Sequence, residues 1–219
     1  MFDETILKMI GMGILDTLYM TLVSSFIAYI IGLPIGILLV ATDRDGITPK
    51  PTINKIVGIF VNIVRSIPFI ILLIAIMPVT RTIIGTTIGA SAVVIPLIAS
   101  SAPYIARIVE SSLKEVDKGV IEAAQSMGAN PMQIIFKVLI PEAKPSLIIG
   151  SAIAISTILS YTVMAGFVGG GGLGDIAIRY GYYRRETEIM LVAVGLLIII
   201  LQIIQELGST ITKSSDKRL

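Results

Sequence analysis

The sequence predicts an all-α polytopic membrane protein with five transmembrane helices and one long hydrophilic loop on the cytoplasmic side. Of its 219 residues, 54% are hydrophobic and 15% are charged, and the mean hydropathy is +0.92. Soluble domains carry roughly 25% charged residues. Five runs with at most one charge are also long enough to cross a bilayer, which takes a helix about 17–25 residues. Composition and run length together place the chain in lipid.

The residue types that are missing exclude several classes of function. The chain has no His and no Cys. It therefore has no imidazole base, no thiolate nucleophile, no disulfide and no His/Cys metal site, and we expect no cofactor. The net charge of +2 is too small to indicate a nucleic-acid partner. The first twenty residues lack a basic segment followed by a small-residue cleavage site, so we expect no cleaved signal peptide.

The predicted spans divide the chain into one membrane domain with short ends. We expect an extracytoplasmic N-terminal segment at 1–12, a transmembrane domain at 13–208 and a cytoplasmic tail at 209–219. The one large hydrophilic loop, at 107–144, lies between the third and fourth spans. The five spans are expected at about 18–41, 56–80, 82–106, 146–167 and 189–208.

The distribution of Lys and Arg favours an N-terminus outside and a C-terminus in the cytoplasm. Cytoplasmic loops of membrane proteins carry an excess of these residues. With this orientation eleven of the seventeen lie in the cytoplasm and five outside, although Arg179, Arg184 and Arg185 place positive charge on the outer side. The eleven are Arg44, Lys50, Lys55, Arg107, Lys114, Lys118, Lys137, Lys144, Lys213, Lys217 and Arg218.

Glycine and proline patterns suggest how the spans turn and pack. Only residues 79–81 separate the second and third spans, which predicts a tight antiparallel pair. The GxxxG patterns at 32–36 and 85–89 allow close helix packing, although simple tolerance of glycine in membrane helices explains either one equally well. Prolines inside the spans are expected to bend them. These are Pro34, Pro68, Pro96 and Pro103.

The capping and helix-ending residues of the hydrophilic loop predict two short helices. Asp117 can cap the start of the first, and Gly128 stands where a glycine would end it. Asn130 followed by Pro131 starts the second, and Pro141 is expected to stop it.

Each of these two helices carries a distinctive surface. On the first, Ala123 and Ala124 form a small surface beside the carboxylate of Glu122. An apolar stripe on the second needs a partner surface, and the residues alone favour the protein's own spans over another protein. The stripe consists of Met132, Ile135, Phe136 and Leu139.

This loop resembles the EAA loop of permease subunits in bacterial ABC importers. The pattern is Glu122-Ala123-Ala124, three residues, Gly128, nine residues, and the four residues Val138-Leu139-Ile140-Pro141, with Val138 and Ile140 as conservative departures. The resemblance implies the type I ABC importer permease fold, in which these helices are coupling helices that dock into a groove of the ATPase subunit. It also favours a partner protein, rather than the protein's own spans, as the surface that covers the apolar stripe. The implied coupling residues are Glu122, Ala123, Ala124, Gly128 and Pro141.

Three further segments look like the methionine-uptake permeases of this superfamily: residues 64–69, 165–175 and 180–182. The likeness covers roughly residues 13–208. It implies a homodimer with two ATPase subunits, a binding lipoprotein on the outer face, and import of L-methionine, with D-methionine as a second cargo. A permease for another amino acid or small solute remains the alternative.

Four residues are candidates for the gate or pathway. The glycines at 169–174 match the Gly-x-Gly-x-x-Gly pattern of dinucleotide-binding sites. No strand precedes them, so a turn is the better interpretation. Gly169 and Gly170 could let an outer gate hinge, with a plain loop equally favoured. Family resemblance adds Met164 as a gate candidate. Arg65 is the one charge inside a predicted span. Its side chain either extends to the membrane surface, or pairs with Ser66 and helix ends near the cytoplasmic boundary, or lines the pathway.

The remaining classes are disfavoured by missing features. The chain has no Gly-x-x-x-x-Gly-Lys-Ser/Thr phosphate loop, so it is expected not to be an enzyme and ATP would bind a separate polypeptide. A secondary transporter needs ionisable residues in its spans, where the predicted boundaries place Arg65 alone. An intramembrane enzyme needs a catalytic carboxylate pair, a Ser/His dyad or a metal site, none of which the predicted spans supply.

Overall fold

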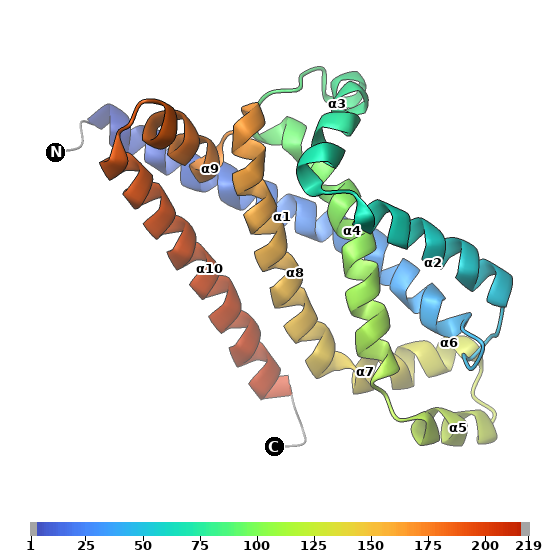
Figure 1. Cartoon of the computed structure of the whole chain (residues 1–219). Helices are drawn as coiled ribbons and strands as arrows, with labels where there is room; N and C mark the ends of the chain where they lie inside the picture. Colours follow the sequence, from blue (N-terminus) through green and yellow to red (C-terminus); the bar gives the residue numbers. More distant parts are fainter. Residues whose placement is uncertain (1–3, 216–219) are drawn as a thin grey trace. The chain divides into compact units, whose positions relative to one another are not determined.

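The computed structural model describes residues 4–215, and every regular element in this range is helical (Figure 1). Four helices are long: α1 (Glu4–Ala41), α4 (Ala90–Lys114), α8 (Lys144–Ala165) and α10 (Thr187–Ser215). The shorter elements lie between them in the sequence. They are α2 (Pro51–Ser66), α3 (Phe69–Ile84), α5 (Lys118–Ser126), α6 (Pro131–Ile134), η1 (Ile135–Leu139), α7 (Ile140–Glu142), η2 (Gly166–Val168), α9 (Gly172–Ile176) and η3 (Ala177–Tyr183).

The helix lengths confirm a polytopic all-α protein. Among the described residues, the four long helices are each apolar enough to cross a membrane, and α2 with α3 makes a fifth span if the bent pair is counted as one. α1 and α10 extend beyond the predicted limits of 18–41 and 189–208, because helical hydrogen bonding continues past the apolar core of a span.

The second predicted span, 56–80, is not one helix. It is divided into α2 and α3 by Ile67 and Pro68. Pro68 has extended backbone angles (φ −55°, ψ 135°) at the start of α3. A proline disfavours helical angles in the residue before it and donates no backbone hydrogen bond, so the ladder stops here. α1 continues through Pro34, and α4 through Pro96 and Pro103.

The turn between the second and third spans lies later than predicted. Residues 79–81 are inside α3, and the turn is at 85–89. Gly85 and Gly89 have φ of 84° and 93°, angles that favour glycine, so this GxxxG pattern serves a turn and not helix packing. The next helix consequently begins at Ala90 rather than at 82.

Two compact units divide the chain, and each long helix contributes to both. Unit 1 comprises Met1–Ile27, Ile67–Ser101 and Ile155–Gln205, and unit 2 comprises Ala28–Ser66, Ala102–Ala154 and Glu206–Leu219. The core of unit 1 includes the fully buried Met20, Leu73, Leu97, Ile158 and Leu173. That of unit 2 includes Leu39, Val61, Ile105, Val109, Leu113, Ile134 and Leu139.

Within unit 2, the GxxxG pattern at 32–36 packs α1 against α4. A Cβ added at Gly32 would lie 2.7 Å from the Ala102 carbonyl oxygen, and one at Gly36 would lie 2.6 Å from Val109 Cβ. Neither position has room for a larger residue. The packing interpretation is therefore confirmed for this pattern.

Candidate functional site

The first loop helix, α5, is bounded by the residues expected at its ends. The Asp117 carboxylate accepts a hydrogen bond from the Gly119 N–H at 2.7 Å and so caps the start. Gly128 follows the helix with φ +80°, and its N–H donates to the Gln125 carbonyl oxygen at 2.9 Å. A Cβ at Gly128 would meet no atom within 4 Å, so the backbone angle alone requires glycine there.

The second loop helix begins with a complete capping box. The Asn130 side chain accepts from the Gln133 N–H, and the Gln133 side chain accepts from the Asn130 N–H, both at 2.9 Å. Pro131 takes the first helical position, where its missing N–H costs nothing. The predicted start of this helix is confirmed.

Pro141 does not end this helix, contrary to the expectation from sequence. The backbone stays helical from α6 through η1 and α7, and η1 is a π-helical turn in which the Ile140 N–H donates to the Ile135 carbonyl oxygen. The wider hydrogen-bonding pattern of this turn accommodates Pro141, which has no backbone N–H to donate. Pro141 itself is exposed in the first turn of α7.

The predicted apolar stripe divides into two pairs with opposite environments. Ile135 and Leu139 are buried, whereas Met132 and Phe136 are 63% and 58% exposed. Each pair has i,i+4 spacing, and the two pairs are offset by about 60° around a helix, so they form the two sides of the stripe. One pair packs within the subunit and the other remains open.

The Glu122-Ala123-Ala124 segment is divided in the same way. Ala124 is buried, and Glu122 and Ala123 are exposed. We call a set of six exposed residues on the two loop helices and their connection the loop face. It comprises Val120, Glu122, Ala123, Met127, Met132 and Phe136.

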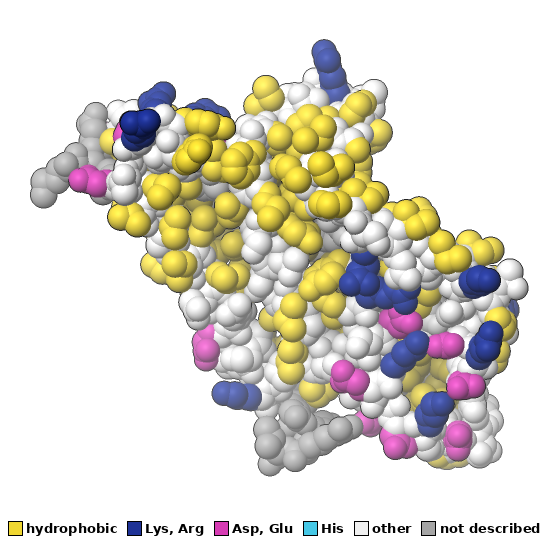
Figure 2. Space-filling view, in the orientation of Figure 1, with side chains coloured by type: hydrophobic (Ala, Val, Ile, Leu, Met, Phe, Trp, Pro, Cys, Tyr) yellow, Lys and Arg dark blue, Asp and Glu magenta, His cyan; other side chains and the backbone are white. Residues whose placement is uncertain are grey.

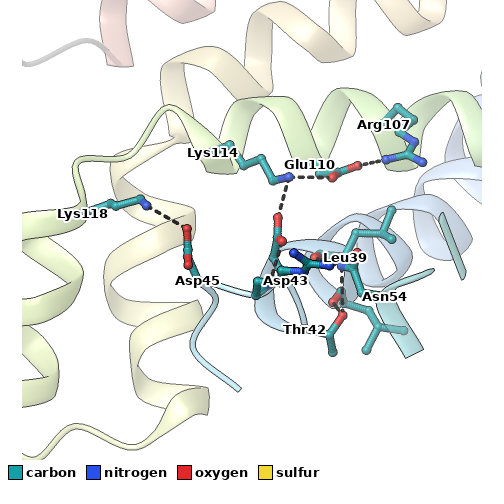
Figure 3. Close-up of polar contacts among 11 residues, drawn as sticks. Leu39, Thr42, Asp43, Asp45, Asn54, Arg107, Glu110, Lys114 and Lys118 are labelled. Carbon is teal, nitrogen blue, oxygen red and sulfur yellow. Dashed lines mark hydrogen bonds and ion pairs between the residues drawn. The ribbon is translucent and has the colours of Figure 1, made fainter. Parts of the chain in front are cut away.

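An ion-pair network lies beside this loop, within unit 2 (Figure 3). Glu110, only 8% exposed, accepts from Arg107 and from Lys114, with Lys114 Nζ 3.0 Å from its carboxylate. Lys114 also pairs with Asp43 at 2.8 Å. A second pair joins Lys118 Nζ and Asp45 at 3.4 Å. Figure 2 shows charged side chains of both signs gathered on the part of unit 2 around α5.

The network reaches the end of α1 through the turn at 42–50. A hydrogen bond from the Lys114 ammonium, helped by the Arg44 N–H, holds the pKa of the Asp43 carboxyl below its ordinary value. Asn54 on α2 donates to the Thr42 hydroxyl in this turn at 3.3 Å and to the Leu39 carbonyl oxygen of α1 at 2.6 Å. The turn is thus connected to α1, α2 and α4.

Arg65 lies in the last turn of α2, just before the break at Pro68. Its guanidinium carbon is 6.0 Å from the centroid of the Tyr104 ring on α4. Ser66 donates to the Asn62 carbonyl oxygen at 2.8 Å instead of meeting Arg65. The side chain is exposed, so its cationic head is available at the surface of unit 2.

The glycines after α8 form a closely packed corner, which we call the glycine corner (166–174, in unit 1). Gly169 has φ +75°. A Cβ at Gly170 would lie 2.7 Å from Val93 Cγ2, and one at Gly166 would lie 2.5 Å from the Asp175 nitrogen. These tight contacts favour a fixed turn at Gly166 and Gly170, whereas a Cβ at Gly169 would meet only Ile88 Cγ2, at 3.6 Å. Met164, 45% exposed, immediately precedes it on α8.

Thr17 on α1 is a site residue that sequence reasoning missed. Its hydroxyl accepts from the Leu173 N–H at 2.9 Å and donates to the Gly13 carbonyl oxygen at 2.8 Å. A Cβ at Gly172 would lie 2.7 Å from this oxygen. No local signal marks Thr17, because its partner is 156 residues away.

The structure therefore gathers the predicted residues into two groups. Met164, Gly169 and Gly170 lie at the glycine corner in unit 1. Arg65, the Glu122–Gly128 segment and Pro141 lie in unit 2. The charged network of unit 2 was also missed, although Arg107, Glu110 and Lys114 have the i, i+3, i+7 spacing of one helix face.

Comparison with known proteins identifies relatives over nearly the whole chain. Residues 32–207 match the family described as "Binding-protein-dependent transport system inner membrane component". A probable D-methionine transport system permease protein of Vibrio cholerae is 47% identical over 203 residues, which are 93% of this chain and 90% of that protein. The methionine import system permease protein of Bacillus subtilis is 45% identical over 181 residues, covering 83% and 82%.

A solved structure has the same fold. It is the MetNI methionine ABC transporter in inward-facing conformations, one chain of which matches with a TM-score of 0.97 and 43% sequence identity. The match covers 99% of this chain and 100% of that chain.

Proposed function

The chain belongs to the binding-protein-dependent transport system inner membrane components, and from this membership we propose that it is the permease subunit of an ATP-driven ABC importer for methionine. The observation that carries the proposal is the capped two-helix loop with its exposed Glu122 and Ala123, in a chain 47% identical to a D-methionine permease. The MetNI match agrees with the permease fold expected from the sequence. The subunit transports, and ATP is hydrolysed on another polypeptide.

The subunit is a multi-pass protein of the cytoplasmic membrane, with its N-terminus outside and its C-terminus in the cytoplasm. Among residues 4–215, ten Lys and Arg lie in unit 2 and five in unit 1. Because positive charge favours the cytoplasmic side, this asymmetry supports unit 2, with the loop face, as the cytoplasmic end. The transmembrane domain would then occupy 13–208, with spans near the predicted positions.

Two copies of the subunit form the pathway, with two ATPase subunits below and a methionine-binding lipoprotein delivering cargo outside. Glu122, Ala123, Ala124, Gly128 and Pro141 belong to the part of the loop that meets the ATPase. The exposed Met132 and Phe136 support a partner there, because apolar side chains on a loop outside lipid need a covering surface.

ATP-driven closure of the ATPase pair would draw the two loops together, and the long helices would carry the movement to the outer gate, giving alternating access. Met164 is the gate candidate. Gly169 and Gly170 set the rigid corner beside it, in place of a hinge. Arg65 lines the pathway at the broken second span, where its exposed guanidinium could meet a cargo carboxylate.

A secondary transporter is the rival class of protein. The argument against it was that the predicted spans contain no ionisable residue except Arg65, and the observed helix bounds change this argument. α1 and α4 extend far enough to include Asp16 and Glu110, two carboxylates outside the predicted spans. Glu110 is paired with Arg107 and Lys114 on its own helix, which neutralises it without a coupling ion. This pairing favours a structural over a proton-carrying carboxylate.

The test is uptake by proteoliposomes that contain this chain together with an ATPase subunit and a binding protein of a methionine importer. We expect methionine uptake that requires ATP and saturates with the binding protein. ATP-independent uptake driven by an ion gradient would contradict the proposal. Uptake of another amino acid in preference to methionine would favour the alternative cargo.

Replacing Gly128 by Val tests the loop itself. A β-branched residue at φ +80° costs about 1–2 kcal/mol and displaces the connection between the loop helices, so we expect uptake to be abolished while membrane insertion is normal. Gly85→Val is the matched control, because Gly85 has φ +84° and equally open space but lies in the α3–α4 turn. Undiminished uptake by the Gly128 variant would contradict the role of the loop.

A further inference from the structure

The two loop helices are fixed to unit 2 by different means. Ala124 is the only buried residue of α5, a residue with one methyl group to contribute. α6 and η1 bury Ile134, Ile135 and Leu139. Since buried aliphatic side chains contribute about 1.5–3 kcal/mol each, apolar packing holds the second helix far more firmly than the first.

A hollow beside α5 explains why its packing is sparse. A cavity of about 360 Å³ lies between α5, the end of α4 and the turn at 42–50. The hollow opens to solvent, since Lys118 and Glu122 in its lining are exposed, and it therefore leaves room for α5 to shift. Its lining includes Val40, Ile47, Leu113, Lys118, Ile121 and Glu122.

The turn on the other side of the hollow is rigidly attached to α1. A Cβ at Gly46 would lie 2.5 Å from the Val40 carbonyl oxygen, so the turn folds directly against the end of the helix. The Thr48 N–H donates to the Ala41 carbonyl oxygen at 2.9 Å. Any force applied to this turn therefore acts on α1.

Two ion pairs span from this turn to α4 and α5. The inner pair, Asp43–Lys114 at 2.8 Å, is continued to the buried Glu110. The outer pair, Asp45–Lys118 at 3.4 Å, joins side chains that are 82% and 74% exposed. Such an exposed pair contributes only about 0–1 kcal/mol to stability, so stability does not explain its position across the hollow.

We propose that Lys114 and Lys118, with Asp43 and Asp45, are positioning residues of the transport step, through which the end of α1 follows the movement of α5. The inner pair keeps the turn aligned with α4. The outer pair, with two long exposed side chains beside a hollow, stays in contact while α5 shifts. This inference rests on the proposed function, because it assumes that the ATPase moves α5.

The test measures methionine transported per ATP hydrolysed by the complete reconstituted complex. The variants are Lys114→Met, Lys118→Met and the charge exchange Asp45→Lys with Lys118→Asp. Lys55→Met on α2 is the matched control, because no ion pair joins this exposed lysine within residues 4–215. Assembly with the ATPase and the thermal unfolding midpoint are recorded for each variant.

We expect ATP hydrolysis to continue while methionine per ATP falls about tenfold for Lys114→Met, within the range of coupling between sites, and less for Lys118→Met. The charge exchange should restore the ratio. For Lys118→Met the unfolding midpoint should not fall with the ratio; a fall in both would indicate a purely structural role and overturn the inference. An unchanged ratio in both lysine variants, or equal loss of hydrolysis and uptake, would overturn the inference alone. Failure of the unaltered complex to transport methionine would instead remove the proposed function, and the inference with it.

Discussion

The glycine corner of unit 1 and the ion-pair network of unit 2 solve the same problem by opposite means. Both hold separate helical elements together. The corner does so by removing side chains, so that Gly166 and Gly174 approach the backbone of Asp175 and Val163 at distances no Cβ tolerates. The network keeps long charged side chains beside an open hollow.

The difference teaches where the molecule can change shape. A corner of backbone contacts has one arrangement, because any displacement opens or overlaps rigid atoms. Ion pairs between flexible side chains persist over small displacements, particularly where a cavity leaves space. The corner therefore fits a fixed support for the gate, and the network fits a movable connection beside the coupling loop.

Filling the glycine corner with a larger side chain should have the largest effect on stability. Gly166→Val would place Cβ 2.5 Å from the Asp175 nitrogen, and backbone atoms cannot rotate away. We expect the free energy of unfolding in detergent to fall by about 3 kcal/mol, the upper part of the range for overpacking. Gly11→Val is the control, since a Cβ there meets nothing within 4 Å. Equal stability of the two variants would show that the corner is loose.

Neutralising the centre of the network should have a smaller effect. Glu110→Gln removes the charge that Arg107 and Lys114 share, and we expect a loss of about 2 kcal/mol in the free energy of unfolding. Glu115→Gln, an exposed change five residues later, should cost little. In 1 M salt the difference in the free energy of unfolding between these two variants should become smaller. The difference between Gly166→Val and Gly11→Val should not change. Salt-independent losses in both regions would contradict the comparison.

The smallest expected effect is the pH dependence of the Asp43 contribution. The folded-state pKa of Asp43 is lowered by Lys114, so its stabilisation is present above the ordinary carboxyl pKa and is lost as pH falls through the folded value. Because both side chains are partly exposed, we expect under about 1 kcal/mol. Unfolding midpoints of the unaltered chain and Asp43→Asn should converge on acidification; a constant difference would contradict the assignment.

Local signals in the sequence were enough to predict three of the four boundaries of the loop helices. Asp117, Gly128 and Asn130 act on backbone groups within a few residues, so their roles can be inferred without tertiary structure. Apolar run length likewise indicated four to five spans, because the bilayer sets the length of each.

Predictions failed where a distant or finer contact decides the geometry. Pro68 divides a run that looks continuous by hydropathy, and the π-helical turn carries the chain through Pro141. Hydropathy cannot distinguish a broken span from a straight one. The partners of Lys114 and Thr17, Asp43 and Leu173, lie 71 and 156 residues away in the sequence. Only the folded chain shows them.

The account depends most directly on what touches the loop face. The chain contains no Cys, so a single Met127→Cys substitution, at a position of that face that is 82% exposed, gives one reactive thiol per subunit. A Cys at Tyr182, on an exposed position in unit 1, is the control. With a short crosslinker and the assembled complex, we predict that position 127 joins the ATPase subunit and position 182 does not. Crosslinks from position 127 only within the permease would contradict the coupling role of this loop.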